Sequence, residues 1–374
     1  MSRGCLAAIL AAAILVMFVP RPWINPTLAL VGLFLMAAAW ALVYLRRPFE
    51  LRFRYPVIAL AGVIVWAICT SHEGDTRLAL LMWLGNLAVF CIAMQAGRRL
   101  LDTLLYFAFA LCLLAVVQYF SGVSKIFWLF PTDAPSWGPF VNRDQYAAFI
   151  EMVLPLALVG ALGGGSRTWR FALMAAAMYA SVIAGASRAG AILTTAEIAI
   201  VPLLCGRRRR VHTVAVWLLA AVFVSVAGGA TLWHRFQDPD PFAGRREILA
   251  GTLAMVRARP WTGFGLGSFR TVYPAYAPLD FGSVVQHAHN DWVEWAEEGG
   301  IPFALLVFSV AVWSAPRVLR TVWGIGAVAI MLHALVDFPL HTPALELWLF
   351  ALLGVLASES TADPARWSFP RRCS

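Results

Sequence analysis

Long apolar runs, each bounded by arginine, proline or a cluster of polar residues, recur along almost the whole chain. They lie at about residues 5–20, 27–45, 56–70, 78–96, 101–121, 146–164, 168–186, 189–205, 212–233, 300–316, 321–338 and 342–357. A helix of about 20 apolar residues is long enough to cross a bilayer. The pattern therefore predicts an all-α, polytopic membrane protein of about twelve transmembrane helices.

The composition excludes a soluble globular protein. The 374-residue chain is 61% hydrophobic and 13% charged, whereas ordinary globular domains are about 45–50% apolar and about 25% charged. The net charge of +9 could suggest a nucleic-acid partner, but the arginines are dispersed between apolar runs instead of forming one basic patch. We therefore expect membrane lipids, and no nucleic acid, as partners.

The distribution of basic residues predicts the orientation of the chain. With a cytoplasmic N-terminus, the inner segments hold eighteen basic residues and the short outer loops hold five, as the positive-inside rule requires. Both termini are then cytoplasmic. We expect one membrane domain, residues 1–357, which includes a long extracytoplasmic loop at 233–299, and a disordered cytoplasmic tail at 358–374. Because the loop is rich in His, Arg, Asp, Glu, Trp and Tyr, we expect the catalytic site there.

The segment 286–300, QHAHNDWVEWAEEGG, predicts a short helix that begins after Asn290. Asparagine is a favoured N-cap residue, so Asn290 could cap this helix. His289 would stand at its mouth, either as an exposed proton acceptor or as a polar capping residue. Glu298 lies about two and a half turns further on, so we expect it to point away from His289 and to accept a structural hydrogen bond.

Residues 244–269 predict an amphipathic helix followed by a glycine-rich turn. Leu249, Leu253 and Val256 share one face, so the helix could rest on the membrane bundle through them. The glycines of TGFGLGSF imitate a nucleotide-binding motif, but no predicted strand precedes them. A tight turn is the expected structure.

Three ionisable residues in or between apolar runs are candidates for function. Arg188 lies near the predicted outer surface, where it either faces a polar cavity or an anionic ligand, or extends its head group to the interface. His333 and Asp337 are four residues apart in the run 321–338, so we expect them to share one helix face. Such a pair is either functional or forms an interhelical hydrogen bond.

Five motifs occur in the order found in one known family: GPFVNRDQYAAFIEMVLPLAL (138–158), SRAG (187–190), GRREIL followed by RPWTGFGLGSF, HAHNDWVEWAEEGG and HALVDFPLHTP. From about residue 138 to 343, the chain resembles the bacterial O-antigen ligase and polymerase superfamily, which includes exopolysaccharide polymerases. It departs from the family pattern at Leu249, where Trp is frequent, and at Asp144, where Asn is common.

The resemblance implies roles for individual residues. His289 matches the histidine that starts the family signature and is expected to be the catalytic base. Arg188 matches the outer-span arginine and Arg245 the arginine that opens the loop helix, and both are expected to bind a diphosphate. The residues expected to support them are Asn290, Glu298, His333 and Asp337.

The resemblance also implies a GT-C-like glycosyltransferase of the bacterial inner membrane. Such proteins move a glycan from an undecaprenyl diphosphate carrier to an acceptor hydroxyl on a glycan or on lipid A core. We expect the two arginines to stabilise the leaving group without a metal or another cofactor, and a single displacement to invert the anomeric configuration. If a metal were bound, Asp280, Asp291 and Glu294 would be the first carboxylates to suspect. Ligation and polymerisation differ only in the acceptor.

Two other classes of protein remain open, namely a membrane transporter of a small anion and a non-catalytic scaffold for envelope assembly. Many transporters place their ionisable groups at mid-membrane, between repeated halves of the fold. Here the ionisable groups gather toward one predicted outer face, and the sequence shows no convincing internal repeat.

Overall fold

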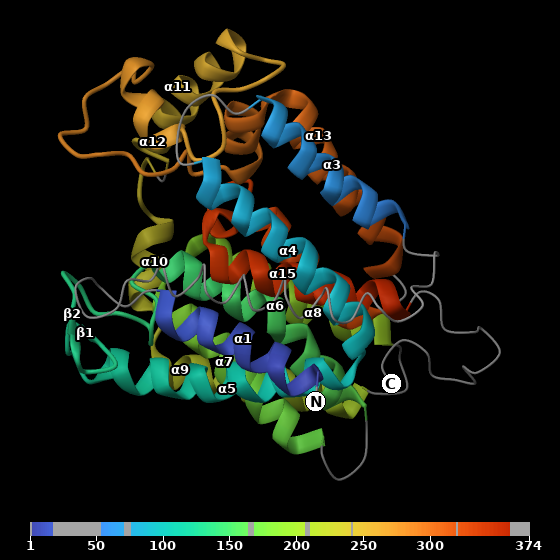
Figure 1. Ribbon diagram of the computed structural model, residues 1–374. Coiled ribbons are helices and arrows are strands. Elements are labelled where there is room, and N and C mark those ends of the chain that lie inside the picture. The colour runs from blue at the N-terminus through green and yellow to red at the C-terminus, as the bar shows by residue number, and fades with distance from the viewer. Residues whose placement is uncertain are drawn as a thin grey trace.

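The computed structural model describes residues 2–17, 54–70, 76–163, 168–205, 210–240, 242–318 and 321–359. These residues are mostly helical (Figure 1). The α-helices are α1 (Ser2–Met17), α3 (Arg54–Thr70), α4 (Thr76–Ala96), α5 (Arg99–Phe120), α6 (Arg143–Leu162), α7 (Thr168–Gly185), α8 (Arg188–Cys205), α9 (Arg210–Ala227), α10 (Ala230–Phe236), α11 (Arg245–Ala258), α12 (Phe269–Val272), α13 (Asp291–Val318), α14 (Ile325–His333) and α15 (Pro343–Glu359). The 3-10 helices are η3 (Tyr273–Ala275), η4 (Val322–Gly324) and η5 (Pro339–His341), and two short strands, β1 (Lys125–Ile126) and β2 (Phe130–Pro131), pair antiparallel.

The predicted apolar runs overlap helices wherever the structure describes them. The run 27–45 and most of the tail 358–374 lie outside the described residues. Five helices are long and apolar enough to cross a membrane: Arg77–Ala96, Arg99–Phe120, Arg143–Leu162, Arg188–Cys205 and Asp291–Val318. A sixth span is possible if the bent pair α9 and α10 crosses as one unit. The chain is thus an all-α polytopic membrane protein, and the total of twelve spans stays a prediction.

The run 212–233 was expected to form one helix, and this prediction is wrong. α9 ends at Ala227, and α10 departs at an angle of 90°. Gly228 lies at the bend with a φ of 78°, a conformation that glycine adopts without a steric penalty. The bend places α10 against the ends of α7 and α8.

α6 and α15 form the centre of the bundle. α15 packs against α4, while α6 packs against α7, α8 and α14. Most side chains of α6 and almost all side chains of α15 are buried. Trp348 in α15, for example, donates from Nε1 to the carbonyl oxygen of Leu10 in α1 at 3.0 Å. A charged residue such as Glu151 in α6 therefore needs a partner inside the protein.

α11 and α12 lie together at one end of the molecule, at the top of Figure 1. The predicted amphipathic helix is present as α11, but its predicted buried face is wrong. Ile248 and Met255 are buried, whereas Leu249, Leu253 and Val256 are half-buried. The reason is that Ile248 and Met255 pack on a small core formed by the loop itself, while α11 also contacts α13. The loop residues in this core include Phe264, Phe269, Tyr273 and Ala288.

The glycine-rich segment forms the expected tight turn. Gly263 and Gly265 have φ values of 64° and 115°, and the N–H of Gly265 donates to the carbonyl oxygen of Glu298 at 2.8 Å. A Cβ on Gly263 would collide with the same carbonyl group. The turn fits against a kink in α13 at Gly300, which has a φ of 78° and a ψ of 169°.

His333 and Asp337 do not share a helix face, so this prediction is wrong. α14 ends at His333, and residues 334–338 form a turn before η5. Pro339 restricts the backbone of Phe338, so a helix could not have continued to this residue, but α14 already ends five residues earlier. Asp337 keeps one helix-like contact, since its N–H donates to the carbonyl oxygen of His333 at 3.1 Å. Its buried carboxylate thereby reaches the start of α13 while it stays close to His333.

Candidate active site

His289 stands at the start of α13 and is held there by Asn290. The Oδ1 atom of Asn290 accepts from the backbone N–H of Val293 at 3.1 Å, and its Nδ2 donates to the carbonyl oxygen of Leu335 at 2.8 Å. The capping role predicted for Asn290 is confirmed. His289 has a φ of 52°, an uncommon left-handed conformation that turns the chain sharply before the helix. The cap thus ties His289 to the turn 334–338.

Asp337 brings His289 and Arg245 together. Its Oδ1 lies 3.1 Å from Nδ1 of His289, and its Oδ2 accepts from Nη2 of Arg245 at 3.0 Å. Arg245, the first residue of α11, also donates from Nη1 to the carbonyl oxygen of Val336 at 2.8 Å. Three segments that are remote in the sequence therefore meet at one carboxylate.

The contacts of Asp337 determine which nitrogen of His289 is basic. Burial raises the pKa of Asp337, but the hydrogen bond from His289 and the charge of Arg245 outweigh burial and hold this pKa well below its usual range. An ionised carboxylate can only accept, so Nδ1 of His289 donates to it and Nε2 carries the lone pair. The His289 side chain is 27% exposed, so another molecule can approach the ring.

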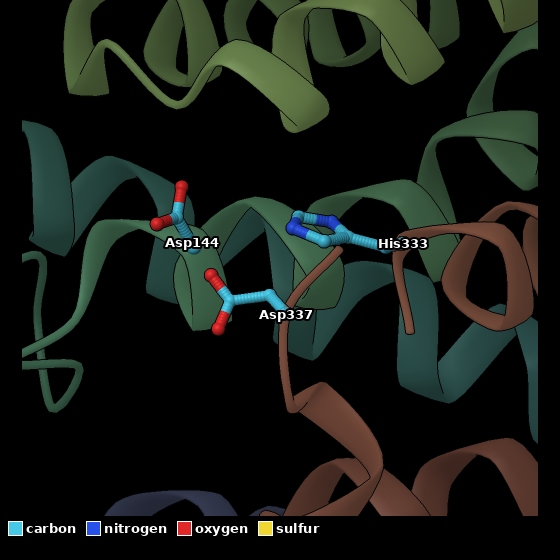
Figure 2. Close-up of side chains that lie close together, drawn as sticks. All are labelled: Asp144, His333 and Asp337. Atoms are coloured by element: carbon cyan, nitrogen blue, oxygen red, sulfur yellow. The ribbon is translucent and has the colours of Figure 1, made fainter. Parts of the chain in front are cut away.

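Asp144, near the N-terminus of α6, faces the same site (Figure 2). Asn142 caps α6 by accepting from the backbone N–H of Asp144 at 2.8 Å. The hydroxyl of Ser187 donates to Oδ1 of Asp144 at 2.6 Å, while Oδ2 lies 3.6 Å from Nη2 of Arg245. Arg245 therefore lies between two carboxylates, those of Asp144 and Asp337.

Arg188 and Arg235 connect the junction of α7 and α8 to α10. Nη1 of Arg188 donates to the carbonyl oxygen of Arg235 at 3.3 Å, and Nη1 of Arg235 donates to the carbonyl oxygen of Ala186. Arg188 also lies 3.9 Å from Oδ2 of Asp238. These reciprocal contacts fix both guanidinium groups close to Ser187, which holds Asp144.

Four arginines from separate segments surround this region, and we call them the arginine cluster: Arg143, Arg188, Arg235 and Arg245. The guanidinium group of Arg235 interacts electrostatically with the other three and with Asp144. Like charges gathered in this way repel one another, and a multiply charged anion relieves that repulsion. The planar fork of arginine also suits phosphate oxygens, which it can bind with two parallel hydrogen bonds.

His333 is buried beside Asp144 and Asp337 (Figure 2). Its Nδ1 lies 2.8 Å from Oε1 of Glu151, and its Nε2 has no hydrogen-bond partner among the described residues. Donor atoms of Asp144, His333 and Asp337 all lie within 4.8 Å of one another, so they could hold a metal ion. Arg245 already places a positive charge against both carboxylates.

The sequence shows no metal-binding motif, yet the described residues contain a second group of suitable donors, Glu294, Glu298 and His341. Because the donors of both groups come from segments that are remote in the sequence, their spacing along the chain does not indicate a metal site. Glu294 is one of the carboxylates suspected from the sequence. Asp280 is not in either group, and instead accepts from the N–H of Gly282 at 2.8 Å in an exposed turn.

His341 lies among carboxylates on the other side of the start of α13. Its Nδ1 contacts Oδ1 of Asp291, and its Nε2 lies 3.6 Å from Oε1 of Glu294 and 3.7 Å from Oε2 of Glu298. Burial alone lowers the pKa of His341, but Glu294 and Asp291 raise it well above its usual value. The ring is therefore an imidazolium that holds the carboxylates together. We call these four residues the acidic cluster.

The acidic cluster fixes the loops around His289. Glu294 accepts from the backbone N–H of Ala288 at 2.7 Å and lies 2.8 Å from Nδ1 of His287. Oε1 of Glu298 accepts from the N–H of Gly267 at 2.7 Å. The structural hydrogen bond predicted for Glu298 is confirmed, and this residue lies beside His341 instead of beside His289.

The structure brings most of the predicted site residues together, in one region. Arg245, His289, Asn290 and Asp337 are joined directly, His333 lies beside Asp337, and Arg188 is connected to them through Ser187 and Asp144. Sequence reasoning missed Glu151, Arg235 and His341 as members of the network. Glu151 could have been found, because it is a charged residue inside the apolar run 146–164.

A comparison with known protein families supports the resemblance described in the sequence analysis. Residues 152–308 match the family model described as O-Antigen ligase. The matched segment contains Arg188, Arg245, His289 and Glu298. A comparison with curated protein sequences finds no match. The resemblance noted in the sequence is thus confirmed: over residues 152–308, this membrane protein is similar to the O-antigen ligase family.

Proposed function

We propose that the chain is a glycosyltransferase of the bacterial inner membrane that moves a glycan from undecaprenyl diphosphate to an acceptor hydroxyl. The O-antigen ligase domain supports a ligase or polymerase type of function in a membrane. The observation that carries the proposal is the double contact of Asp337, 3.1 Å from His289 and 3.0 Å from Arg245. It joins a candidate base to a candidate phosphate ligand.

Arg188 and Arg245 would stabilise the leaving diphosphate. Polyprenyl diphosphate is an acidic leaving group, so it needs charge stabilisation more than it needs a proton. Arg245 is oriented by Val336 and Asp337, and Arg188 is oriented by the carbonyl oxygen of Arg235. Because both side chains are held by the protein before the substrate arrives, little reorganisation is needed at the moment of reaction.

His289 would act as the general base. The acceptor oxygen attacks the anomeric carbon, the bond from that carbon to the diphosphate oxygen breaks, and its electron pair leaves with undecaprenyl diphosphate. The proton of the acceptor hydroxyl passes to Nε2 of His289, while Nδ1–H stays bonded to Asp337. Asp337 would stabilise the resulting imidazolium, as the aspartate does in a catalytic triad. His333 would hold the turn that carries Asp337 through its contact with Glu151.

A single displacement inverts the anomeric configuration, and this is the stereochemistry that we propose. We also propose that the reaction needs no metal ion. Arg245 lies 3.0 Å from Asp337 and 3.6 Å from Asp144, so its guanidinium group supplies positive charge at the position where these carboxylates could otherwise share a cation.

The site would face the outer side of the inner membrane, with both chain termini in the cytoplasm. The donor would be a glycan linked to undecaprenyl diphosphate, and the acceptor either a glycan or lipid A core. The family match favours neither an anion transporter nor a non-catalytic scaffold. The base and the phosphate-binding arginines have a direct use in transfer that neither alternative explains.

Deletion of the gene followed by analysis of envelope glycans tests the proposed function. Loss of a ligase should leave polymerised glycan on its lipid carrier, whereas loss of a polymerase should leave single repeat units. Unchanged glycans would argue against transfer. Expression of the wild-type protein from a plasmid should restore the original glycan pattern.

A cysteine introduced into the loop before His289 tests the proposed orientation of the protein in the membrane. Ser283 is exposed in the loop before His289, so a Ser283→Cys variant should react with a membrane-impermeant thiol reagent in intact spheroplasts. The matched background is the unsubstituted protein, treated in the same way. Labelling of Ser283→Cys only after lysis would overturn the external site.

A further inference from the structure

Asp144 lies in an unusual place for a carboxylate, because it shares a proposed anion site with the arginine cluster. Its Oδ2 lies 3.6 Å from Nη2 of Arg245. Arg235 donates to the carbonyl oxygen of Ala186, next to the Ser187 that holds Asp144, and the charges of Arg235 and Asp144 interact. Arg143 is the neighbour of Asp144 in the chain. A diphosphate held by these arginines would lie close to a carboxylate that repels it.

The contacts of Asp144 indicate that it acts on the arginine cluster through its negative charge and not through a direct hydrogen bond. Oδ1 accepts from Ser187 at 2.6 Å, and the helix cap uses the backbone N–H of Asp144. An asparagine could accept the same hydrogen bond from Ser187 and keep the cap. The 3.6 Å separation from Arg245 is too long for a direct hydrogen bond, so Oδ2 acts on that guanidinium group mainly through its charge.

We propose that Asp144 is the resident counter-anion of the arginine cluster, and that Arg235 is a third arginine that binds the diphosphate. The inference rests on the proposed function. Before the substrate arrives, Asp144 offsets part of the repulsion among the guanidinium groups. After transfer, its negative charge weakens the hold on undecaprenyl diphosphate and favours release of this product.

Diphosphate binding to Asp144→Asn tests this proposal. The probes are farnesyl diphosphate and inorganic pyrophosphate, added to the purified full-length protein in detergent with EDTA. Removing a negative charge beside the bound diphosphate should tighten binding about tenfold or more. In a transfer assay, kcat and KM should both fall, because the product then leaves more slowly. Asp144→Glu keeps the charge and should not tighten binding.

A double-mutant cycle tests the role of Arg235. Arg235→Gln should weaken the binding of farnesyl diphosphate about tenfold, since one guanidinium contact is lost. The gain in affinity caused by Asp144→Asn should then be smaller in the Arg235→Gln background, because the two side chains act on one ligand. Asp240→Asn is the matched control: it changes the net charge equally, but Asp240 is paired with Arg246 in an exposed position, so affinity should stay the same.

The direction in which Asp144→Asn changes the affinity for diphosphate decides whether Asp144 is a counter-anion or a metal ligand. Unchanged or weaker diphosphate binding by Asp144→Asn would overturn the proposal, and weaker binding in the presence of Mg²⁺ would instead indicate a cation shared with His333 and Asp337. If Asp240→Asn tightened diphosphate binding equally, the effect would come from net charge alone, and the proposal would also be overturned. If the wild-type protein binds neither probe, the proposed function fails together with this inference.

Discussion

The two histidine–carboxylate clusters that flank the start of α13 use the same residue types and differ in their surroundings. His289 has one nitrogen on Asp337, its side chain is 27% exposed, and a guanidinium group shares the carboxylate. His341 has carboxylates near both nitrogens, and its side chain is 12% exposed. One carboxylate and an open face leave a base that can accept a proton. Several carboxylates in a closed space instead favour the cationic form of His341, which holds loops in position.

Replacement of the exposed histidine should have the largest effect. His289→Ala should lower glycan transfer about 10²–10⁴-fold, since the proton of the acceptor hydroxyl then has no base. Membrane insertion and protein abundance should be unchanged, because His289 lies outside the packed bundle. The measurement is transfer by membranes with matched amounts of protein. His234→Ala, at an exposed position of α10, is the control, and wild-type transfer by His289→Ala would remove this residue from the mechanism.

Lysine replacements at the two arginines proposed to bind the diphosphate should have the next largest effect. Arg245 uses two nitrogens to hold Val336 and Asp337, and a lysine ammonium cannot reproduce this planar fork. We expect Arg245→Lys and Arg188→Lys each to lower turnover about 10- to 100-fold. Arg257→Lys, at an exposed position of α11, should retain activity. Full turnover by both site variants would show that a point charge is sufficient.

The contrast between these residues also shows what a sequence can predict. The helices follow from the apolar runs, and the cap at Asn290 follows from its position before an amphipathic segment. The turn after His333 was missed, because the apolar run continues to residue 338 although α14 ends at His333. The meeting of Arg245 with Asp337 could not be predicted either. It depends on how the loop helix folds back over the bundle, which spacing along the chain does not encode.

Changes in the acidic cluster should act mainly on stability. His341→Gln removes the positive charge among Asp291, Glu294 and Glu298, and leaves those carboxylates uncompensated. We expect a loss of about 3 kcal/mol in the free energy of unfolding, as when one partner of a buried ion pair is removed. Thermal unfolding of the purified protein in detergent measures this loss. An unchanged Tm would contradict the assignment of His341 as a structural imidazolium.

The smallest expected effect is a dependence of stability on pH. The pKa of His341 is raised in the folded protein above the ordinary value of 6.5, so its stabilising contribution is complete below about pH 6.5. That contribution should decline as the pH rises toward the raised pKa. Tm measured from pH 6 to pH 9 should therefore fall more steeply in the wild-type protein than in His341→Gln. Parallel curves for the two proteins would contradict the prediction.

The most direct test of the central claim is transfer by purified protein in liposomes, with an undecaprenyl diphosphate-linked glycan as donor and excess EDTA present. The account predicts that glycan reaches the acceptor with inverted anomeric configuration, and that one undecaprenyl diphosphate is released for each glycan transferred. His289→Ala in the same liposomes should release almost none. A reaction that stops in EDTA and resumes with magnesium or manganese would contradict the claim that arginines alone balance the charge of the leaving group.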